Sequence, residues 1–386
     1  MDNGKLIDFN VEDVYSADGQ LRGHVEPPPK LKQFLGQASW YLRDSNWDPD
    51  FPTAAQSAEW FFLKETGRQV DGVIAINLFL AQKILEATGP ISLPDYNETI
   101  NSQNLFERAE YYSEINFFPG STQKKDFLGS LAKTLFINLQ NQDTKNTFKS
   151  GLAIFESLQQ KDVLLSLHDE KANQSLASLN WSGHIQNFPS KENTLNDYLF
   201  IVEANVGVNK ANFFVTRSTN HQIDISKTGE TTETLNLIYQ NESPSESWPA
   251  GTYQNYLRIY CPYDSLLNSL KINDQEISPT QIDTSLEHQK TVFGFLVKVP
   301  IKASTKVTLS YQTPLKFNFQ TEVQNFNFLF QKQSGAKPNQ AEIKINFPQF
   351  LKIIKTSPQA SVTPQEVVFQ ETLDQDKILN INFFSQ

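Results

Sequence analysis

The spacing of apolar residues along the chain changes near residue 190. Before that point, apolar positions recur every three or four residues in several segments, as in amphipathic helices, and short apolar runs between them indicate buried strands. The predicted helices are 31–35, 53–66, 78–87, 101–112, 122–139, 143–159 and 169–179, and the predicted strands are 5–15, 70–76, 91–93 and 163–167. This alternation favours a layered α/β domain over residues 1–190.

From about residue 197 the apolar period becomes two, which is typical of half-buried strands. Ten short strands are predicted, over 198–202, 212–217, 232–239, 256–261, 292–299, 306–311, 326–330, 342–347, 366–370 and 378–383. They favour an antiparallel β-sandwich region over residues 191–386, either a single sandwich or two sub-domains at about 191–318 and 319–386. We expect no helix longer than about two turns after residue 200.

The segment 40–52 concentrates polar and aromatic residues before the helix predicted at 53–66. Pro49 and Pro52 disfavour helical geometry in the residues before them, so we predict an ordered, non-helical loop with Thr53 as the helix cap. A polar loop that leads into a helix N-terminus is a common place for binding chemistry. This segment is the strongest sign of a functional site in the chain.

The first residues predict a hairpin turn at residues 2–5, directly before the strand. A hairpin turn needs a strand on each side, and none precedes this one. We therefore expect the chain to begin inside a domain, with residues 5–11 in a sheet beside a vacant strand position.

Charge and composition exclude several classes of protein. The net charge of −10 argues against nucleic-acid binding, which depends largely on lysines and arginines that neutralise phosphates. Cys261 is the only cysteine, so an internal disulfide and a multi-cysteine zinc site are excluded; it is expected to be a buried strand residue. The five histidines show no metal-binding spacing, and no signal peptide or membrane-length apolar run is present.

Two groups of residues could bind a ligand. Lys124 and Lys125 fall in the first turn of a predicted helix, where exposed N–H groups favour an anion; the alternative is ordinary solvated lysines. The aspartates of the loop, Asp44, Asp48 and Asp50, offer oxygen ligands to a divalent cation, but capping and turn roles are favoured. Trp40 and Trp47 are expected to pack in the core rather than to stack on a sugar.

Five segments resemble the bacterial family called domain of unknown function 4012. They are 11–21, 40–52, 70–76, 87–91 and 117–127, and the resemblance covers roughly residues 1–165. Members typically carry an N-terminal membrane helix, and the resemblance implies that this anchor has been lost from the present chain. The resemblance implies a protein on the extracellular face of the bacterial cell envelope, membrane-anchored in its full-length form. The family has no established activity.

The order of these segments is in turn distantly similar to the LytR–CpsA–Psr phosphotransferases, which have an α/β/α layered fold. Those enzymes transfer polyprenyl-linked glycans to the cell wall. Glu12-Asp13 stands where they have an Arg-Asp pair, and Lys124-Lys125 stands where they have arginines. The candidate ligand-binding residues that follow are Asp13, Arg43, Asp44, Asn46, Asp48, Lys124 and Lys125, with Asp13 and Asp44 also candidates for a divalent cation.

The leading function from the sequence is a cell-envelope protein that binds an anionic or glycan-linked ligand, such as a cell-wall glycan or a polyprenyl-phosphate glycan. One alternative is an active phosphotransferase, and another is a non-enzymatic adhesin or spacer. No resident cofactor is expected beyond a divalent cation, and catalytic residues are not assigned. If the resemblance carries function, Asp13, Arg43, Asp44 and the Lys124–Lys125 helix start are expected to converge on one cleft.

Overall fold

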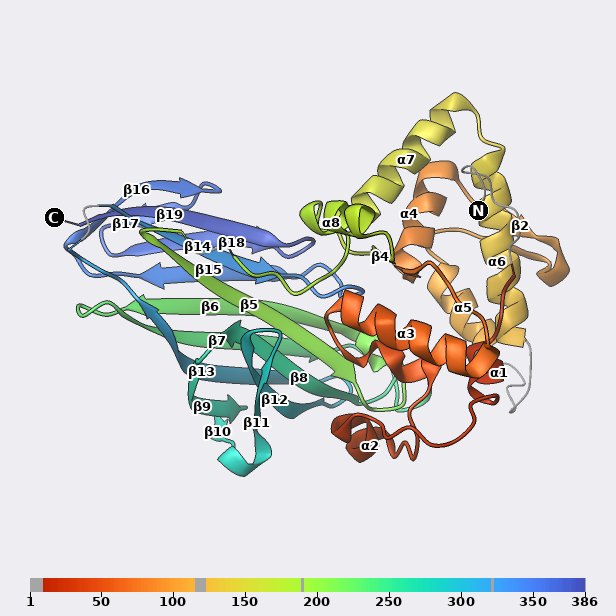
Figure 1. The fold of residues 1–386 in the computed structure, drawn as a ribbon, viewed down its shortest axis with the longest axis horizontal. Helices are drawn as coiled ribbons and strands as arrows, with labels where there is room; N and C mark the ends of the chain where they lie inside the picture. The colour runs from red at the N-terminus through yellow and green to blue at the C-terminus, as the bar shows by residue number, and fades with distance from the viewer. Residues whose placement is uncertain (1–9, 115–122, 189–190, 321–322, 386) are drawn as a thin grey trace. The chain divides into compact units, whose positions relative to one another are not determined.

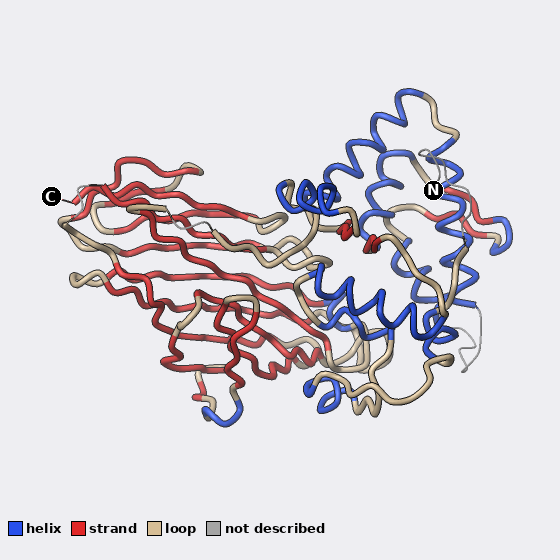
Figure 2. The backbone as a smooth tube through the Cα atoms, in the orientation of Figure 1, coloured by secondary structure: helices blue, strands red, loops and turns tan. Residues whose placement is uncertain are grey.

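The computed structural model describes residues 10–114, 123–188, 191–320 and 323–385. Contacts within the chain divide it into two compact units. The first comprises Met1–Lys32 and Gln37–His184, and the second comprises Gln33–Gly36 and Ile185–Gln386. Helices predominate in the first unit and strands in the second (Figures 1 and 2). The chain therefore combines mixed α/β content with two large β-sheets, as predicted from the change in apolar period.

The described part of the first unit contains seven α-helices, the first half of an eighth, α2, and four short strands. The α-helices are α1 (Val14–Asp18), α2 (Pro29–Leu35), α3 (Phe51–Thr66), α4 (Leu78–Thr88), α5 (Leu105–Glu114), α6 (Gln123–Gln140), α7 (Thr144–Gln159) and α8 (Glu170–Ser178). The strands are β1 (Gly72–Ile76), β2 (Ile91–Leu93), β3 (Glu98–Ile100) and β4 (Val163–Leu167), and two 3₁₀ helices are η1 (Leu42–Trp47) and η2 (Pro94–Tyr96). No described helix is both long and apolar enough to span a bilayer.

Strands β1 and β4 pair antiparallel, from Gly72 opposite Leu167 to Ile76 opposite Val163. One face of this pair packs on Phe51 and Ala55 of α3, where the side chain of Leu164 is buried. A separate apolar cluster joins α4, α5 and α6 to the β2–β3 hairpin. The described residues thus place α3 against β1–β4, but they do not establish the α/β/α layering that the resemblance implied.

Helix α3 begins earlier than predicted, and Thr53 is not its cap. The Asp50 carboxylate accepts a hydrogen bond from the Thr53 backbone N–H at 3.2 Å, and the helix starts at Phe51. Pro52 lies in the first turn, where its missing N–H costs no hydrogen bond, so it begins the helix instead of prolonging the loop. Residues 42–47 also form the 3₁₀ helix η1 instead of a non-helical loop, because Pro49 restricts only the residue before it.

The strand predicted over residues 5–15 is wrong in its described part. Residues 10–13 form no strand, and Val14–Asp18 is helix α1. The Asp13 carboxylate accepts a hydrogen bond from the Ser16 N–H at 3.1 Å, which caps this helix and explains why the alternation stops there. Residues 1–9 lie outside the described residues, so the predicted turn and the vacant strand position are not tested.

The second unit is built from strands and two 3₁₀ helices. The first strands are β5 (Thr194–Asn205), β6 (Val215–Ile225), β7 (Glu230–Asn241), β8 (Tyr253–Pro262), β9 (Leu266–Ile272), β10 (Gln275–Glu276), β11 (Asp283–Glu287), β12 (Lys290–Val299) and β13 (Ser304–Lys316). The remaining strands are β14 (Val323–Gln331), β15 (Gln340–Asn346), β16 (Leu351–Ser357), β17 (Ser361–Thr363), β18 (Glu366–Thr372) and β19 (Lys377–Ser385). Beyond residue 200, the helices of the described chain are η3 (Ala211–Phe214) and η4 (Pro279–Gln281), so the expected absence of long helices is confirmed there.

These strands form two sheets. One has eight strands in the order β10-β9-β13-β7-β6-β15-β18-β17, and the other has seven in the order β11-β12-β8-β5-β14-β19-β16. The expected purely antiparallel arrangement is wrong at two places, because β14 pairs parallel with β5 and β15 pairs parallel with β6. Strands before and after residue 318 therefore share both sheets.

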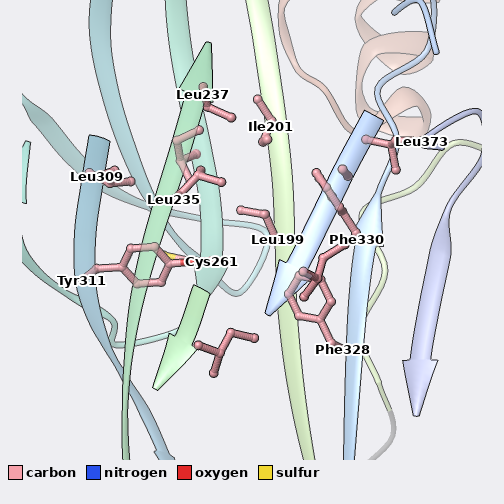
Figure 3. Packing of buried hydrophobic residues seen from close by; sticks show 14 of the residues in the cluster. Leu199, Ile201, Leu235, Leu237, Cys261, Leu309, Tyr311, Phe328, Phe330 and Leu373 are labelled. Atoms are coloured by element: carbon pink, nitrogen blue, oxygen red, sulfur yellow. The ribbon is translucent and has the colours of Figure 1, made fainter. Parts of the chain in front are cut away.

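One hydrophobic core lies between the two sheets and draws on alternate residues of both (Figure 3). Phe328 and Phe330 of β14 point into it, as do Leu235 and Leu237 of β7. Cys261 of β8 is fully buried in this core, as predicted from its strand pattern. Burial raises the pKa of its thiol, which keeps it in the neutral form.

The same core encloses a cluster of ionisable side chains that the sequence analysis did not single out. His221 of β6 and Glu233 of β7 are fully buried, with 2.8 Å between Nε2 and the carboxylate, and the Tyr311 hydroxyl donates to the same carboxylate oxygen at 2.6 Å. Asp197 of β5 is fully buried beside them. Burial raises the pKa of Glu233 to about 7 and lowers that of His221 to about 4.

Candidate functional site

Arg43 is the arginine of the predicted site, and the structure engages it within the first unit. Its guanidinium donates to Asp18 at 2.7 Å and to the Gln37 side-chain oxygen at 3.0 Å. The Asp44 carboxylate lies 3.5 Å from its Nε, and the Tyr41 ring lies 4.5 Å below the guanidinium. Since Asp18 is buried, this contact ties η1 to α1. The Arg43 guanidinium is therefore in contact with Asp18, Gln37, Asp44 and Tyr41.

The surroundings of Arg43 carry more negative than positive groups. Asp18 and Asp44 are joined there by Glu65 of α3, which accepts a hydrogen bond from the Leu42 N–H at 3.3 Å. Burial raises the pKa of both Asp44 and Glu65, the charge of Asp18 adds to this, and Arg43 opposes it. An anionic ligand would meet this excess of carboxylates, so the geometry does not favour anion binding at Arg43.

The other predicted site residues take local roles or lie outside the described part of the chain. Asp13 caps α1, and the Asp48 carboxylate accepts a hydrogen bond from the Asp50 N–H at 2.8 Å, which is a turn role. Asn46 is exposed in η1. Lys124 and Lys125 fall in the first turn of α6, but their side chains lie outside the described residues. Convergence of all these residues on one cleft therefore stays a prediction.

Two further expectations can be compared with the described residues. Trp40 packs its ring against the edge of Phe61 at 5.1 Å between centroids, as expected of a packing group. Within the described ranges, no three histidine, cysteine, aspartate or glutamate side chains are arranged to hold a metal ion, and this includes Asp44. That finding leaves the question of a cofactor open.

An open groove lies elsewhere in the first unit, and sequence reasoning missed it. Its volume is about 460 Å³, and it is lined by Gln56, Glu59, Trp60, Leu63, Gln69, Val70, Asp71 and His168. The four residues from α3 are spaced by three, one and three positions, which places them on one face of the helix. That spacing is the signal in the sequence that could have indicated this face.

The far wall of the groove is built where β1 begins and β4 ends. Because Gly72 pairs with Leu167, the preceding Asp71 and the following His168 meet at the same end of the strand pair. The His168 backbone N–H donates to the Asp71 carbonyl at 3.0 Å, which holds the two residues together. Residues far apart in sequence thereby reach one site.

The Trp60 ring is the main apolar surface of the groove. It is 44% exposed, although a tryptophan on a helix of this kind would ordinarily bury more of its ring. Buried Phe61 supports it edge-on at 4.9 Å between centroids, so its orientation is held by the core. The exposed Lys64 amine lies 5.7 Å from the ring centroid.

Polar groups surround this ring. The His168 imidazole lies 2.8 Å from the Glu59 carboxylate, and that hydrogen bond raises the pKa of His168, with the Asp71 charge contributing less. The side-chain amides of Gln56 and Gln69 can both donate and accept hydrogen bonds. The groove thus presents a flat aromatic surface next to two carboxylates and two amides.

Comparison with known proteins identifies the N-terminal region. Residues 1–112 match the profile of the family described as Protein of unknown function (DUF4012), and this confirms the family resemblance over those residues. A similarity to LytR–CpsA–Psr enzymes is not shown by this match. No curated protein matches the chain.

Solved structures that align with the chain do so at low similarity. A proposed nutrient binding protein from Legionella pneumophila is 10% identical, with 49% of this chain and 71% of that chain covered and a TM-score of 0.34. An M1 zinc metallopeptidase from Deinococcus radiodurans is 9% identical, with 44% and 41% covered and a TM-score of 0.25. Aminopeptidase A from Legionella pneumophila is 13% identical, with 46% and 22% covered and a TM-score of 0.26. The chain spans less than half the length of these two peptidases, and TM-scores this low carry no argument about function.

Proposed function

We propose that this chain, whose N-terminal region belongs to the DUF4012 family, is a glycan-binding protein of the bacterial cell envelope. The groove around Trp60 is the proposed binding site. The observation that carries the proposal is the exposed Trp60 ring inside a groove whose other walls are hydrogen-bonding side chains. An extracellular location and the LytR–CpsA–Psr-like layering are parts of the same proposal and rest on the family resemblance.

The chemistry of a sugar ring suits this groove. A pyranose has a face of C–H groups that packs on a flat aromatic ring and a rim of hydroxyls that needs donors and acceptors. Trp60 offers the flat surface, and Glu59, Asp71 and Gln56 offer the hydrogen-bonding partners. The volume of about 460 Å³ lies within the range of small-ligand pockets.

Charge indicates which glycans fit. Glu59 and Asp71 are carboxylates, and the hydrogen bond from His168 offsets only part of their charge near neutral pH. The two carboxylates on the groove wall would repel an acidic sugar but not a neutral or amino sugar, and the Lys64 amine near the Trp60 ring offsets only part of this repulsion. An anionic or glycan-linked ligand was expected from the sequence. Of these two, the groove favours the glycan.

The first prediction is that replacing Trp60 with alanine weakens glycan binding by at least about tenfold, which corresponds to about 1.4 kcal/mol. The loss follows because the variant removes the stacking surface while the polar rim remains. Isothermal titration calorimetry would compare tetramers of N-acetylglucosamine, glucosamine and galacturonic acid. The neutral and amino-sugar tetramers are expected to bind, and the acidic tetramer is expected to bind weakly or not at all.

Tyr263→Ala is the matched control, because Tyr263 is an aromatic residue of the second unit with a similar exposure of 48%. This variant should bind like the parent chain. Equal binding by the Trp60→Ala variant, or a preference for the acidic tetramer, would show that the ligand binds elsewhere.

A further inference from the structure

Helix α7 packs into the first unit through small residues. Ser150, Ala153 and Ser157 are its buried residues, and they lie on one side of the helix. Helix α4 contacts α7 and runs beside it in Figure 1. Small side chains let two helices approach closely, and Phe148, Leu152 and Phe155 lie on the other side of α7.

The outward side of α7 is apolar. Phe148, Leu152 and Phe155 are 67%, 53% and 53% exposed, and the Phe155 ring also contacts the Trp181 ring of the same chain edge-on, at 6.2 Å between centroids. At 3.6 residues per turn they lie on the side of the helix opposite Ser150 and Ser157. Single exposed apolar residues are ordinary, but three large ones in a row on a helix form a surface that water covers poorly. We call these three residues the outer ridge.

The spacing of the outer ridge is that of a helix-pairing seam. Steps of four and then three residues correspond to the d, a and d positions of a heptad. The next a positions in each direction are Lys145 and Gln159, so the seam ends in polar residues near both ends of the helix. Its length suits one short partner helix.

The residues that flank the seam differ in charge between its two sides. On the e side stand Lys149 and Glu156, which are both exposed. On the g side stand Thr144, Gly151 and Leu158, which carry no charge. In a parallel helix pair, e positions face g positions of the partner, whereas in an antiparallel pair e positions face e positions. Only the antiparallel arrangement brings opposite charges together.

We propose that the outer ridge binds the outer ridge of a second copy of this chain, with the two α7 helices antiparallel. Leu152 of each copy packs on Phe155 of the other, and Phe148 packs on the stem of Gln159. Lys149 of each copy then faces Glu156 of the other, so the interface carries two symmetric ion pairs. Gly151 leaves room for close approach on the uncharged side.

The dimer formed by this surface is expected to be weak. A single helix of 16 residues gives an interface at the small end of specific contacts. Exposed ion pairs add little affinity, but they exclude the arrangements in which like charges meet. The association should therefore depend on protein concentration and should weaken at high salt.

Sedimentation equilibrium of the whole chain over a range of concentrations is the first test. A reversible dimer is expected, and Leu152→Glu should raise its dissociation constant at least about tenfold. Circular dichroism of the variant should match the parent chain, because Leu152 contributes little to the core. A chain that stays monomeric at every concentration would overturn the proposal.

Charge reversal tests the orientation. K149E places four acidic side chains along the interface and E156K places four basic ones, so each variant alone should dimerise more weakly than the parent chain. Mixing the K149E chain with the E156K chain should produce a heterodimer, detected by energy transfer between labelled chains, and the double variant K149E/E156K should again self-associate. Single reversals without effect, or a mixture that does not associate, would exclude this interface.

A lipid surface is the competing occupant of the outer ridge. Flotation with vesicles of phosphatidylglycerol and phosphatidylcholine would detect it. The proposal would be overturned in favour of the membrane if the chain bound these vesicles as a monomer, if it did not self-associate, and if Leu152→Glu abolished the vesicle binding.

Discussion

Replacing Arg43 with methionine is expected to lower the free energy of unfolding of the first unit by about 3–5 kcal/mol. Methionine keeps most of the aliphatic stem but removes the guanidinium that donates to buried Asp18 at 2.7 Å and neighbours Asp44. The carboxylates left behind, with Glu65 near them, would lose the cation that offsets their burial. Breaking a buried ion pair from one side is costly for this reason.

The measurement is urea denaturation followed by tryptophan fluorescence. Four of the five tryptophans lie in the first unit, so the signal reports mainly on that unit. Arg68→Met is the control, because Arg68 also pairs with a carboxylate, that of Glu12, but both side chains are largely exposed. This control should cost much less stability than Arg43→Met, because an exposed ion pair contributes little.

A double variant separates the structural role of Arg43 from a role in binding. Adding Asp18→Asn to Arg43→Met removes the uncompensated carboxylate and should restore part of the lost stability. If Arg43→Met left stability unchanged and abolished ligand binding instead, the anion-binding role expected from the sequence would be correct.

The stability of the β-sandwich is expected to fall by on the order of 3 kcal/mol between pH 5 and pH 7 because of its buried ionisable cluster. In the folded state, burial raises the pKa of Glu233 to about 7 and that of Asp197 well above its usual range, and lowers the pKa of His221 to about 4. Between pH 5 and 6.5 the folded Glu233 therefore keeps its proton, and burial favours the neutral acid of Asp197 as well, so the folded cluster binds more protons than the unfolded chain. The unfolded chain holds about one there, on the imidazole, because both carboxyl groups are ionised.

The sign follows from this proton count. Folding takes up protons between pH 5 and 6.5, so stability falls as the pH rises, by about 1.4 kcal/mol per pH unit for each proton taken up. Above pH 6.5 the unfolded imidazole also loses its proton, and the loss becomes steeper until the folded carboxyl groups ionise. If the proton on Glu233 were instead on His221, the folded cluster would still hold the same number of protons.

Glu233→Gln should remove most of the pH dependence, because folded and unfolded chains then hold one proton each at pH 5–6.5. Thermal unfolding at several pH values, followed by the far-ultraviolet circular dichroism of the sheets, would show this as a flatter profile. Glu230→Gln on the same strand is the control. Its pKa is lowered by hydrogen bonds from Thr228 and Lys316, so it is ionised in both states above pH 5 and its removal should not change the slope. A parent profile that rises from pH 5 to 7 would contradict the proton count.

The local pattern of apolar and polar residues was sufficient to predict much of the secondary structure. The period-two alternation predicted Cys261 as a buried strand residue, and the apolar run at 163–167 matches β4 at both ends. Where the prediction failed, a single side chain decided the boundary. The Asp50 carboxylate caps α3 three residues before Thr53, and Asp13 turns an alternating segment into α1. A capping hydrogen bond is a local choice that apolar periodicity does not contain.

By itself, the sequence determined the family resemblance of residues 1–112 and the division of the chain into a mixed and a strand-rich part. Tertiary structure alone decided which distant residues meet. The parallel pairing of β5 with β14, the contact of Arg43 with Asp18, and the meeting of Trp60 with His168 all join segments whose local patterns say nothing of one another. Periodicity specifies which side of an element is apolar, but the partner of that side is chosen by the packing of the whole unit.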